Sequence, residues 1–255
     1  MRTREKIIQD ELEACPYIEG ARARLPMRWQ LRQVPGERFD ELLALGDRRV
    51  GRMLYRTTCP ECTACEPIRV PVAGFVPTRA QRRILNKNKD ITVEAGPATY
   101  SDEKLALYQR HKSERGLDRS EVPMNRTGYE GWFVHSCTDT IEMIYRVQGR
   151  MIGVGIVDLG QRDASSVYFF FDPDEHRRSL GVFSVLMEIA WLRANGGRHL
   201  YLGLYVEDCR HLVYKAGYAP HERLRGGAWL PTAEARPPTA AADDGGEADE
   251  DDGPG

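Results

Sequence analysis

Residues 165–206 have the sequence SSVYFFFDPDEHRRSLGVFSVLMEIAWLRANGGRHLYLGLYV, and this stretch decides the fold. Its first eight residues, 165–172, are rich in aromatic side chains and predict a strand. The apolar segment that begins at Ser179 and stops at Gly196 predicts a helix, and residues 198–206 predict a second strand. A strand, a helix and a strand in succession indicate an α/β unit.

Elements before this unit extend it into a larger domain. Residues 101–116 predict a helix between a capping Ser and a terminating Gly. Segments 141–147 and 151–160, separated by a short turn, predict a β-hairpin. Antiparallel strands followed by strand, helix and strand are typical of α/β (α+β) acyltransferases of the GNAT type, in which neighbouring strands open a cleft for an activated acyl group and an amine. We therefore expect a GNAT-like domain over residues 98–230.

The motif CPECTAC places Cys59, Cys62 and Cys65 in one tight turn, and Cys15 is the candidate for a fourth ligand. Thiolates at this spacing bind soft metals, so the four cysteines predict zinc or an iron–sulfur cluster. A ferredoxin would need a further Cys where Arg69 stands. The alternative is a set of reduced, partly buried thiols without metal.

These cysteines lie in a small N-terminal domain that we predict over residues 1–97. The same domain contains a predicted helix over residues 78–90, with Thr78 as its N-cap. Five basic residues in this helix are unopposed by any acid before Asp90: Arg79, Arg82, Arg83, Lys87 and Lys89. If they share one face they would neutralise phosphates, whereas the alternative is an ordinary solvated helix face.

The composition limits the class of protein. The chain of 255 residues, with 41% hydrophobic and 29% charged residues, has enough apolar material for a folded core. No stretch approaches the roughly 20 apolar residues that cross a bilayer, and the charged N-terminus has no apolar signal segment. We therefore expect a cytoplasmic protein without membrane contact.

The charge is unevenly distributed. Residues 231–255 contain eight acidic residues and one Arg, so this segment has a net charge of −7 and residues 1–230 have a net charge of +5. The last 15 residues have no aromatic or β-branched side chain and cannot bury enough surface to offset their ordering entropy. We expect a disordered acidic tail that increases solubility or, alternatively, binds a partner.

Two series of motifs resemble bacterial aminoacyl-tRNA–protein transferases. The first is Tyr55-Arg56-Thr57-Thr58-Cys59-Pro60, Pro67-Ile68-Arg69-Val70, Phe75-Val76-Pro77-Thr78-Arg79 and Gln81-Arg82-Arg83. The second is Phe171-Asp172-Pro173-Asp174, Ser179-Leu180-Gly181, Leu200-Tyr201-Leu202-Gly203 and Tyr214-Lys215. The resemblance runs from about Cys15 to Trp229.

This resemblance implies a GNAT-like transferase domain after a small Cys-containing domain. It implies transfer of an amino acid from a charged tRNA to the N-terminal amine of a protein that begins with Asp or Glu, which marks that protein for degradation through the N-degron pathway. Short bacterial members use leucine from Leu-tRNA and eukaryotic relatives use arginine from Arg-tRNA, so leucine is expected and arginine is the alternative. In eukaryotic relatives the Cys-rich part is associated with zinc or an iron–sulfur cluster.

The reaction indicates which residues to examine. The ester donor is already activated, so no cofactor or covalent intermediate is required, only positioning, removal of the amine proton and stabilisation of the oxyanion. Asp172 is the candidate base or orienting group, unless it is only a turn residue. Backbone amides from Ser179 to Gly181 are candidates for binding the oxyanion or a phosphate, unless Ser179 is only a helix cap.

The remaining candidates would bind the substrates. A cation must recognise the acceptor's acidic side chain, and the candidates are Arg79, Arg82, Arg83 and Lys215. Four tyrosines are candidates for lining the pocket and stacking on the terminal adenine, with core packing as the equal alternative: Tyr168, Tyr201, Tyr205 and Tyr214.

Two rival functions stay open at this point. A GNAT-type N-acetyltransferase would bind acetyl-CoA at the turn between Arg178 and Phe183, but Phe183 replaces a small residue and is expected to obstruct the pyrophosphate. A non-catalytic nucleic-acid-binding protein with a zinc knuckle would explain the cysteines and the basic helix, but it would leave the second domain without a role.

Overall fold

The computed structural model describes residues 5–117 and 122–232. Its largest feature is an eight-stranded sheet in the order β14-β13-β7-β12-β11-β10-β9-β8, in which only β11 and β12 are parallel neighbours. The strands are β7 (Glu66–Pro71), β8 (Ile91–Pro97), β9 (Asp139–Val147), β10 (Arg150–Leu159), β11 (Ala164–Phe171), β12 (His199–Tyr205), β13 (His221–Arg225) and β14 (Ala228–Thr232). The predicted α/β class is confirmed as a mixed α/β fold around one large mixed sheet.

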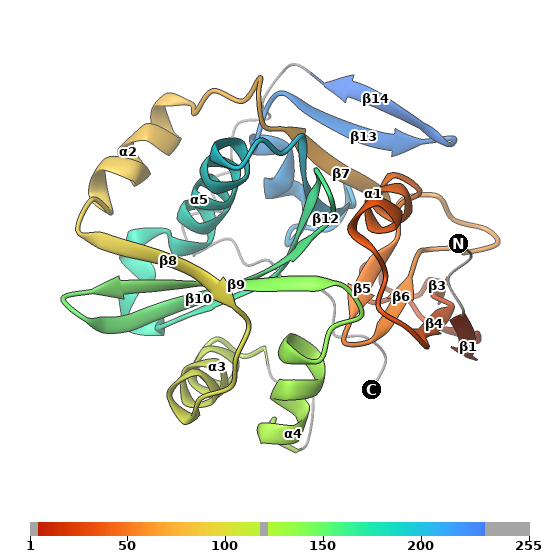
Figure 1. Ribbon diagram of the computed structural model, residues 1–255. Coiled ribbons are helices and arrows are strands. Elements are labelled where there is room, and N and C mark those ends of the chain that lie inside the picture. The colour runs from red at the N-terminus through yellow and green to blue at the C-terminus, as the bar shows by residue number, and fades with distance from the viewer. Residues whose placement is uncertain (1–4, 118–121, 233–255) are drawn as a thin grey trace.

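Helices cover both faces of this sheet (Figure 1). One face carries α2 (Arg79–Lys87) and α5 (Leu180–Ala194), and the other carries α3 (Asp102–Glu114) and α4 (Arg126–Tyr129). The aromatic residues of β11 pack into the cores on both faces of the sheet, because alternate side chains of a strand point to opposite faces. Phe169 and Phe171 enter the α5 core, whereas Tyr168 and Phe170 enter the α3 core.

Local sequence signals explain why these elements form where predicted. Helix α2 begins with a capping box, in which the Thr78 hydroxyl accepts a bond from the Gln81 amide (3.2 Å) and the Gln81 side chain accepts one from the Thr78 amide (2.9 Å). The Ser101 hydroxyl accepts a bond from the Lys104 amide (3.2 Å) and caps α3. The β9–β10 hairpin turns at Gln148 and Gly149, which have φ values of 49° and 83°.

The N-terminal residues form a second, four-stranded sheet in the order β1-β4-β6-β5. Its strands are β1 (Glu5–Gln9), β4 (Met27–Gln30), β5 (Arg48–Val50) and β6 (Met53–Tyr55), and it is accompanied by α1 (Gly36–Ala44) and by the small hairpin of β2 (Leu12–Ala14) and β3 (Arg22–Arg24). A buried ion pair connects the two sheets, because Arg49 of β5 donates to Asp158 of β10 at 2.5 Å and both side chains are inaccessible to solvent.

The large sheet includes strands from both predicted domains. β7 lies between β13 and β12, and β8 forms an edge beside β9. Residues 66–97 therefore share the sheet and the core of the predicted 98–230 domain, although the sequence analysis placed them in the 1–97 domain. The segment predicted as the acidic tail, 231–255, begins with the last two residues of β14, and its remainder lies outside the described residues.

Candidate active site

The most distinctive backbone feature is the divergence of β11 and β12. These parallel strands pair only at Ala164 with Leu200 and Ser165 with Tyr201, near their first residues. β12 then continues beside β7, with Tyr205 opposite Glu66. The carboxyl ends of β11 and β12 are therefore separate. The backbone N–H and C=O groups there make no hydrogen bonds between these two strands.

The start of α5 follows the carboxyl end of β11. Ser179 has φ 54°, in the left-handed region that residues other than glycine seldom adopt, and its side chain makes no capping bond. The first amides of α5, from Leu180 through Gly181, therefore have neither an intrahelical acceptor nor a side-chain cap. Of the two interpretations of Ser179, a side-chain helix cap is wrong, while a role of Ser179 and Gly181 in binding an anion stays a prediction.

Phe183 does not obstruct these amides. Its side chain is buried in the α5 core and meets the Tyr145 ring edge-on at a centroid distance of 6.0 Å. The expectation that Phe183 would exclude a pyrophosphate by its bulk is therefore wrong, because one turn of helix directs the ring inward.

Asp172 is held in a network of ion pairs. Its carboxylate accepts a bond from the Asp174 amide (3.1 Å), pairs with Arg110 (3.1 Å) and also pairs closely with Arg150. The Asp172 amide in turn donates to the carbonyl of Ile152 in β10 (2.9 Å). These are the contacts of a residue that fixes the turn after β11, and its role in catalysis stays a prediction.

The four predicted tyrosines are divided among three clusters of the core and do not gather in one. Tyr168 belongs to the aromatic cluster under α3, with its ring 5.6 Å from that of Phe133. Tyr201 lies on the α1 side, where its hydroxyl accepts a bond from Arg69 (2.8 Å) and burial raises its pKa to about 12. Tyr205 is buried beneath the guanidinium of Arg223. All three side chains contribute to the core, and a role in lining a substrate pocket stays a prediction.

Tyr214 and Lys215 lie in the short helix η3 (Val213–Gly217) after β12. Tyr214 packs partly buried against the α5 core, and Lys215 is buried with 1% of its surface exposed. By contrast, Arg79, Arg82 and Arg83 are exposed on α2. Of the four cations proposed for acceptor recognition, the three arginines are therefore exposed to solvent and Lys215 is buried in the core.

The four predicted metal ligands share one neighbourhood. Burial, together with the nearby thiols of Cys15, Cys59 and Cys62, raises the pKa of the Cys65 thiol to about 12. All four are free and partly exposed. Over residues 5–117 and 122–232, however, no three His, Cys, Asp or Glu side chains are arranged to hold an ion. The described geometry does not form a ready metal site, and zinc or an iron–sulfur cluster stays a prediction.

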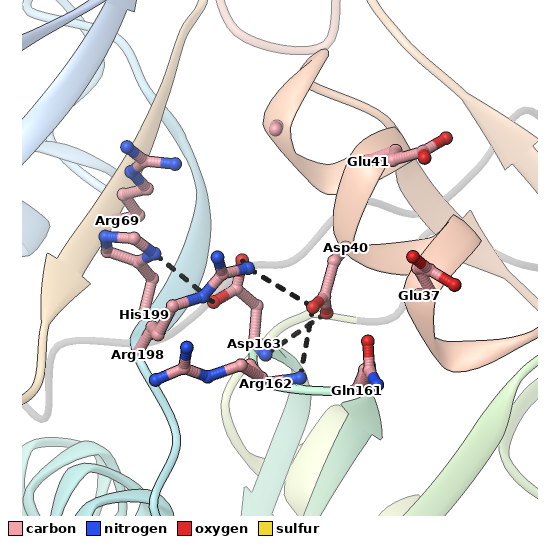
Figure 2. Close-up of a pocket in the computed structure, with 10 residues that line it drawn as sticks. Glu37, Asp40, Glu41, Arg69, Gln161, Arg162, Asp163, Arg198 and His199 are labelled. Carbon is pink, nitrogen blue, oxygen red and sulfur yellow. Dashed lines mark hydrogen bonds and ion pairs between the residues drawn. The ribbon is translucent and has the colours of Figure 1, made fainter.

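A separate pocket of about 470 Å³ lies at the opposite end of β11 and β12, beside α1 (Figure 2). Asp40 of α1 accepts bonds from the amides of Arg162 (3.0 Å) and Asp163 (3.1 Å) and from the Arg198 guanidinium (3.3 Å). Burial alone would raise the pKa of Asp163, but bonds from His199 and Arg198 hold it below its ordinary value. The Asp40 carboxylate thus joins α1 to the large sheet, while the Asp163 carboxylate joins the start of β11 to Arg198 and His199 at the start of β12.

Comparison with known proteins identifies the family. The profile described as "Arginine-tRNA-protein transferase, N terminus" matches residues 13–83, and the one described as "Arginine-tRNA-protein transferase, C terminus" matches residues 103–225. A protein of Acinetobacter baumannii named aspartate/glutamate leucyltransferase is 37% identical over 216 residues, which cover 84% of this chain and 80% of the relative. The chain belongs to the aminoacyl-tRNA–protein transferase family.

A second relative supports this assignment. The protein of that name from Pseudomonas fluorescens is 33% identical over 227 residues, which cover 89% of this transferase and 97% of the relative. Among solved structures, FemX aligns with 72% of this chain and 64% of its own at 10% identity, with a TM-score of 0.42. The resemblance predicted from the motifs is confirmed. In the described ranges of the transferase, no helix has the length and apolar character needed to cross a membrane.

One residue of the transferase was missed by the sequence analysis. Arg48 of β5 lies against Gly203 of β12, where a Cβ atom would stand 2.9 Å from the Arg48 Nη2 atom. Gly203 has φ 77° and lies within a shift of register near the divergence from β11. A glycine inside the predicted strand is a signal of close approach by another group, and here that group is a guanidinium from the N-terminal sheet.

Proposed function

We propose that this protein transfers leucine from Leu-tRNA to the α-amino group of proteins that begin with Asp or Glu, and so marks them for degradation through the N-degron pathway. The observation that carries the proposal is the 33–37% identity to proteins named aspartate/glutamate leucyltransferase over most of the chain. Cytoplasmic location is part of the same proposal, since charged tRNA and nascent acceptor proteins are found there.

The chemistry is an aminolysis. The acceptor nitrogen attacks the carbonyl carbon of the leucyl ester, a C–N bond forms, and the bond from that carbon to the ribose 3′ oxygen breaks. The acceptor ammonium first loses one proton to water; the neutral amine then attacks and loses a second proton as the amide forms, and the departing 3′ oxygen gains one. Because an α-amine has a pKa near 8, a useful fraction is already neutral at pH 7.5, and no strong base is needed.

We place this reaction where β11 and β12 diverge, in a GNAT-like arrangement. The uncapped amides at Leu180 and Gly181 are suited to bind the oxyanion, because helix N-termini favour negative charge. Asp172 acts as a positioning residue, since its two oxygens are held by Arg110 and Arg150 while its backbone leads into α5. Arg48, partly exposed beside Gly203, is suited to pair with the acceptor's carboxylate.

The test supplies purified full-length protein with radiolabelled Leu-tRNA or Arg-tRNA and with peptides that begin with Asp, Glu or Ala. We expect leucine to be transferred to the Asp and Glu peptides only. Transfer of arginine instead would establish the alternative donor. Acetyl-CoA in place of tRNA is expected to give no product, and acetylation of the peptides would contradict the proposal.

A further inference from the structure

Helix α2 presents a continuous basic face. Arg79, Arg82, Arg83 and Lys87 are all exposed, and their spacing of three or four residues places them on the same side of the helix. The opposite side carries the residues that pack inward, including the buried Gln81. Over nine residues this face is about 13 Å long.

The basic face continues toward the start of α5. The Lys87 ammonium donates to the carbonyl of Arg177, and the Asn88 side chain donates to the carbonyl of Arg178 at 2.9 Å. Both carbonyls belong to η2 (Pro173–Arg178), the segment between β11 and α5. Two further exposed cations belong to this region: Lys89 follows α2 directly, and Arg177 is the residue whose carbonyl Lys87 contacts. Figure 1 shows α2 beside α5, away from the N-terminal sheet.

None of these six cations has an acidic partner within 4 Å in the described part of the chain. The nearby Asp90 is already paired, because both its oxygens bind the Arg178 guanidinium at 2.9 Å. The summed charge of these six side chains, +6, is larger than the net charge of residues 1–230, which is +5. The excess positive charge of the folded chain is therefore concentrated on this surface, which we call the α2 basic face.

We propose that the α2 basic face binds the phosphodiester backbone of the donor tRNA close to its aminoacylated 3′ end. The inference rests on the proposed function and adds the surface on which the RNA lies. A row of exposed cations suits a chain of phosphates, whereas the single carboxylate of an acceptor needs one convergent site. RNA on this face would reach the start of α5, where the ester is expected to react.

The first test measures binding of Leu-tRNA by fluorescence anisotropy at several salt concentrations. The variant is Arg79→Gln/Arg82→Gln/Arg83→Gln in the full-length protein. Removing three phosphate contacts is expected to lower affinity at least about tenfold at 100 mM salt and to reduce the slope of log K against log salt by about 2 to 3. The matched control is Arg32→Gln, an exposed arginine after β4, for which neither quantity is expected to change.

The second test separates RNA binding from the reaction itself. Transfer is compared for Leu-tRNA and for 3′-leucyl-adenosine, a donor without phosphates. The triple variant is expected to lose at least about tenfold more transfer from Leu-tRNA than from leucyl-adenosine. Equal losses with the two donors, or unchanged tRNA affinity, would overturn the inference. Absence of transfer from both donors by the unaltered protein would instead contradict the proposed function.

The chain's own acidic segment is the competing occupant of this surface. If residues 233–255 occupy it in place of the RNA, their deletion leaves tRNA affinity unchanged, and the triple variant binds tRNA as tightly as the unaltered protein. That combination of results would reject the RNA as the occupant of this face.

Discussion

His111 of α3 is buried against the end of β11. Its ring accepts a bond from the Phe171 amide (3.1 Å), and burial, aided by the positive charge of Arg115, lowers its pKa to about 3. An unfolded histidine has a pKa near 6.5. The unfolded state therefore binds more protons than the native state as the pH falls below that value.

We expect the free energy of unfolding to decrease by about 2 kcal/mol between pH 7 and pH 5 through His111 alone. The stabilisation is complete above pH 6.5 and declines as the pH falls toward 3. Urea unfolding at a series of pH values measures it. In His111→Asn, which retains an acceptor for the Phe171 amide, this share of the pH dependence should disappear; an unchanged pH profile would show that His111 is not the group responsible.

Asp172 provides a second prediction at the scale of one residue. Asp172→Ala removes the acceptor of the Asp174 amide and of two guanidinium groups, and we expect it to cost about 2 kcal/mol of stability. Asp172→Asn keeps an oxygen for the turn, so transfer should fall less than about tenfold. A loss of a hundredfold or more in Asp172→Asn, with native stability, would establish it as the base.

Two helices of the same core begin in different ways. α2 starts at a capping box formed by Thr78, whereas α5 starts at a left-handed Ser179 whose side chain caps nothing. We expect Thr78→Ala to lower the free energy of unfolding by about 1 kcal/mol and Ser179→Ala to change it by less than about 0.5 kcal/mol. Denaturant titration of the two variants compares them directly, and equal losses would mean that Ser179 makes a capping bond in solution.

Elements with complete local signals were predictable from the sequence. α2 and α3 have capping residues, α3 and α5 end before a glycine with positive φ, and the β9–β10 hairpin has a two-residue turn; all four form as expected. β7 was not predicted as a strand of the large sheet, although Ile68, Val70 and Val72 alternate. Its neighbours β12 and β13 lie more than 120 residues away, and a local pattern contains no information about such a partner.

The candidate site was less predictable for the same reason. Asp172 and Ser179 could be selected because they flank a strand and a helix, but the guanidiniums that hold Asp172 come from α3 and β10. Arg48 approaches Gly203 from the N-terminal sheet. The sequence could not divide the tyrosines among the clusters of the core, because buried aromatic residues and pocket-lining ones have the same local pattern.

At the scale of the whole molecule, the two sheets depend on each other. Arg49→Met would leave the buried Asp158 carboxylate without its cation, beside the Thr140 hydroxyl at 2.6 Å, and we expect a loss of about 3–5 kcal/mol in the free energy of unfolding. The double variant Arg49→Met/Asp158→Leu should recover most of this loss. Chemical denaturation followed by fluorescence measures both, and an Arg49→Met protein of native stability would show that the pair contributes nothing.

The position of β7 between β12 and β13 also has a consequence for synthesis. When β7 leaves the ribosome, both of its edges stay unsatisfied until well over a hundred further residues have been translated. Pairings so distant in sequence form slowly. The nascent chain therefore carries a strand with two open edges while more than 120 further residues are added.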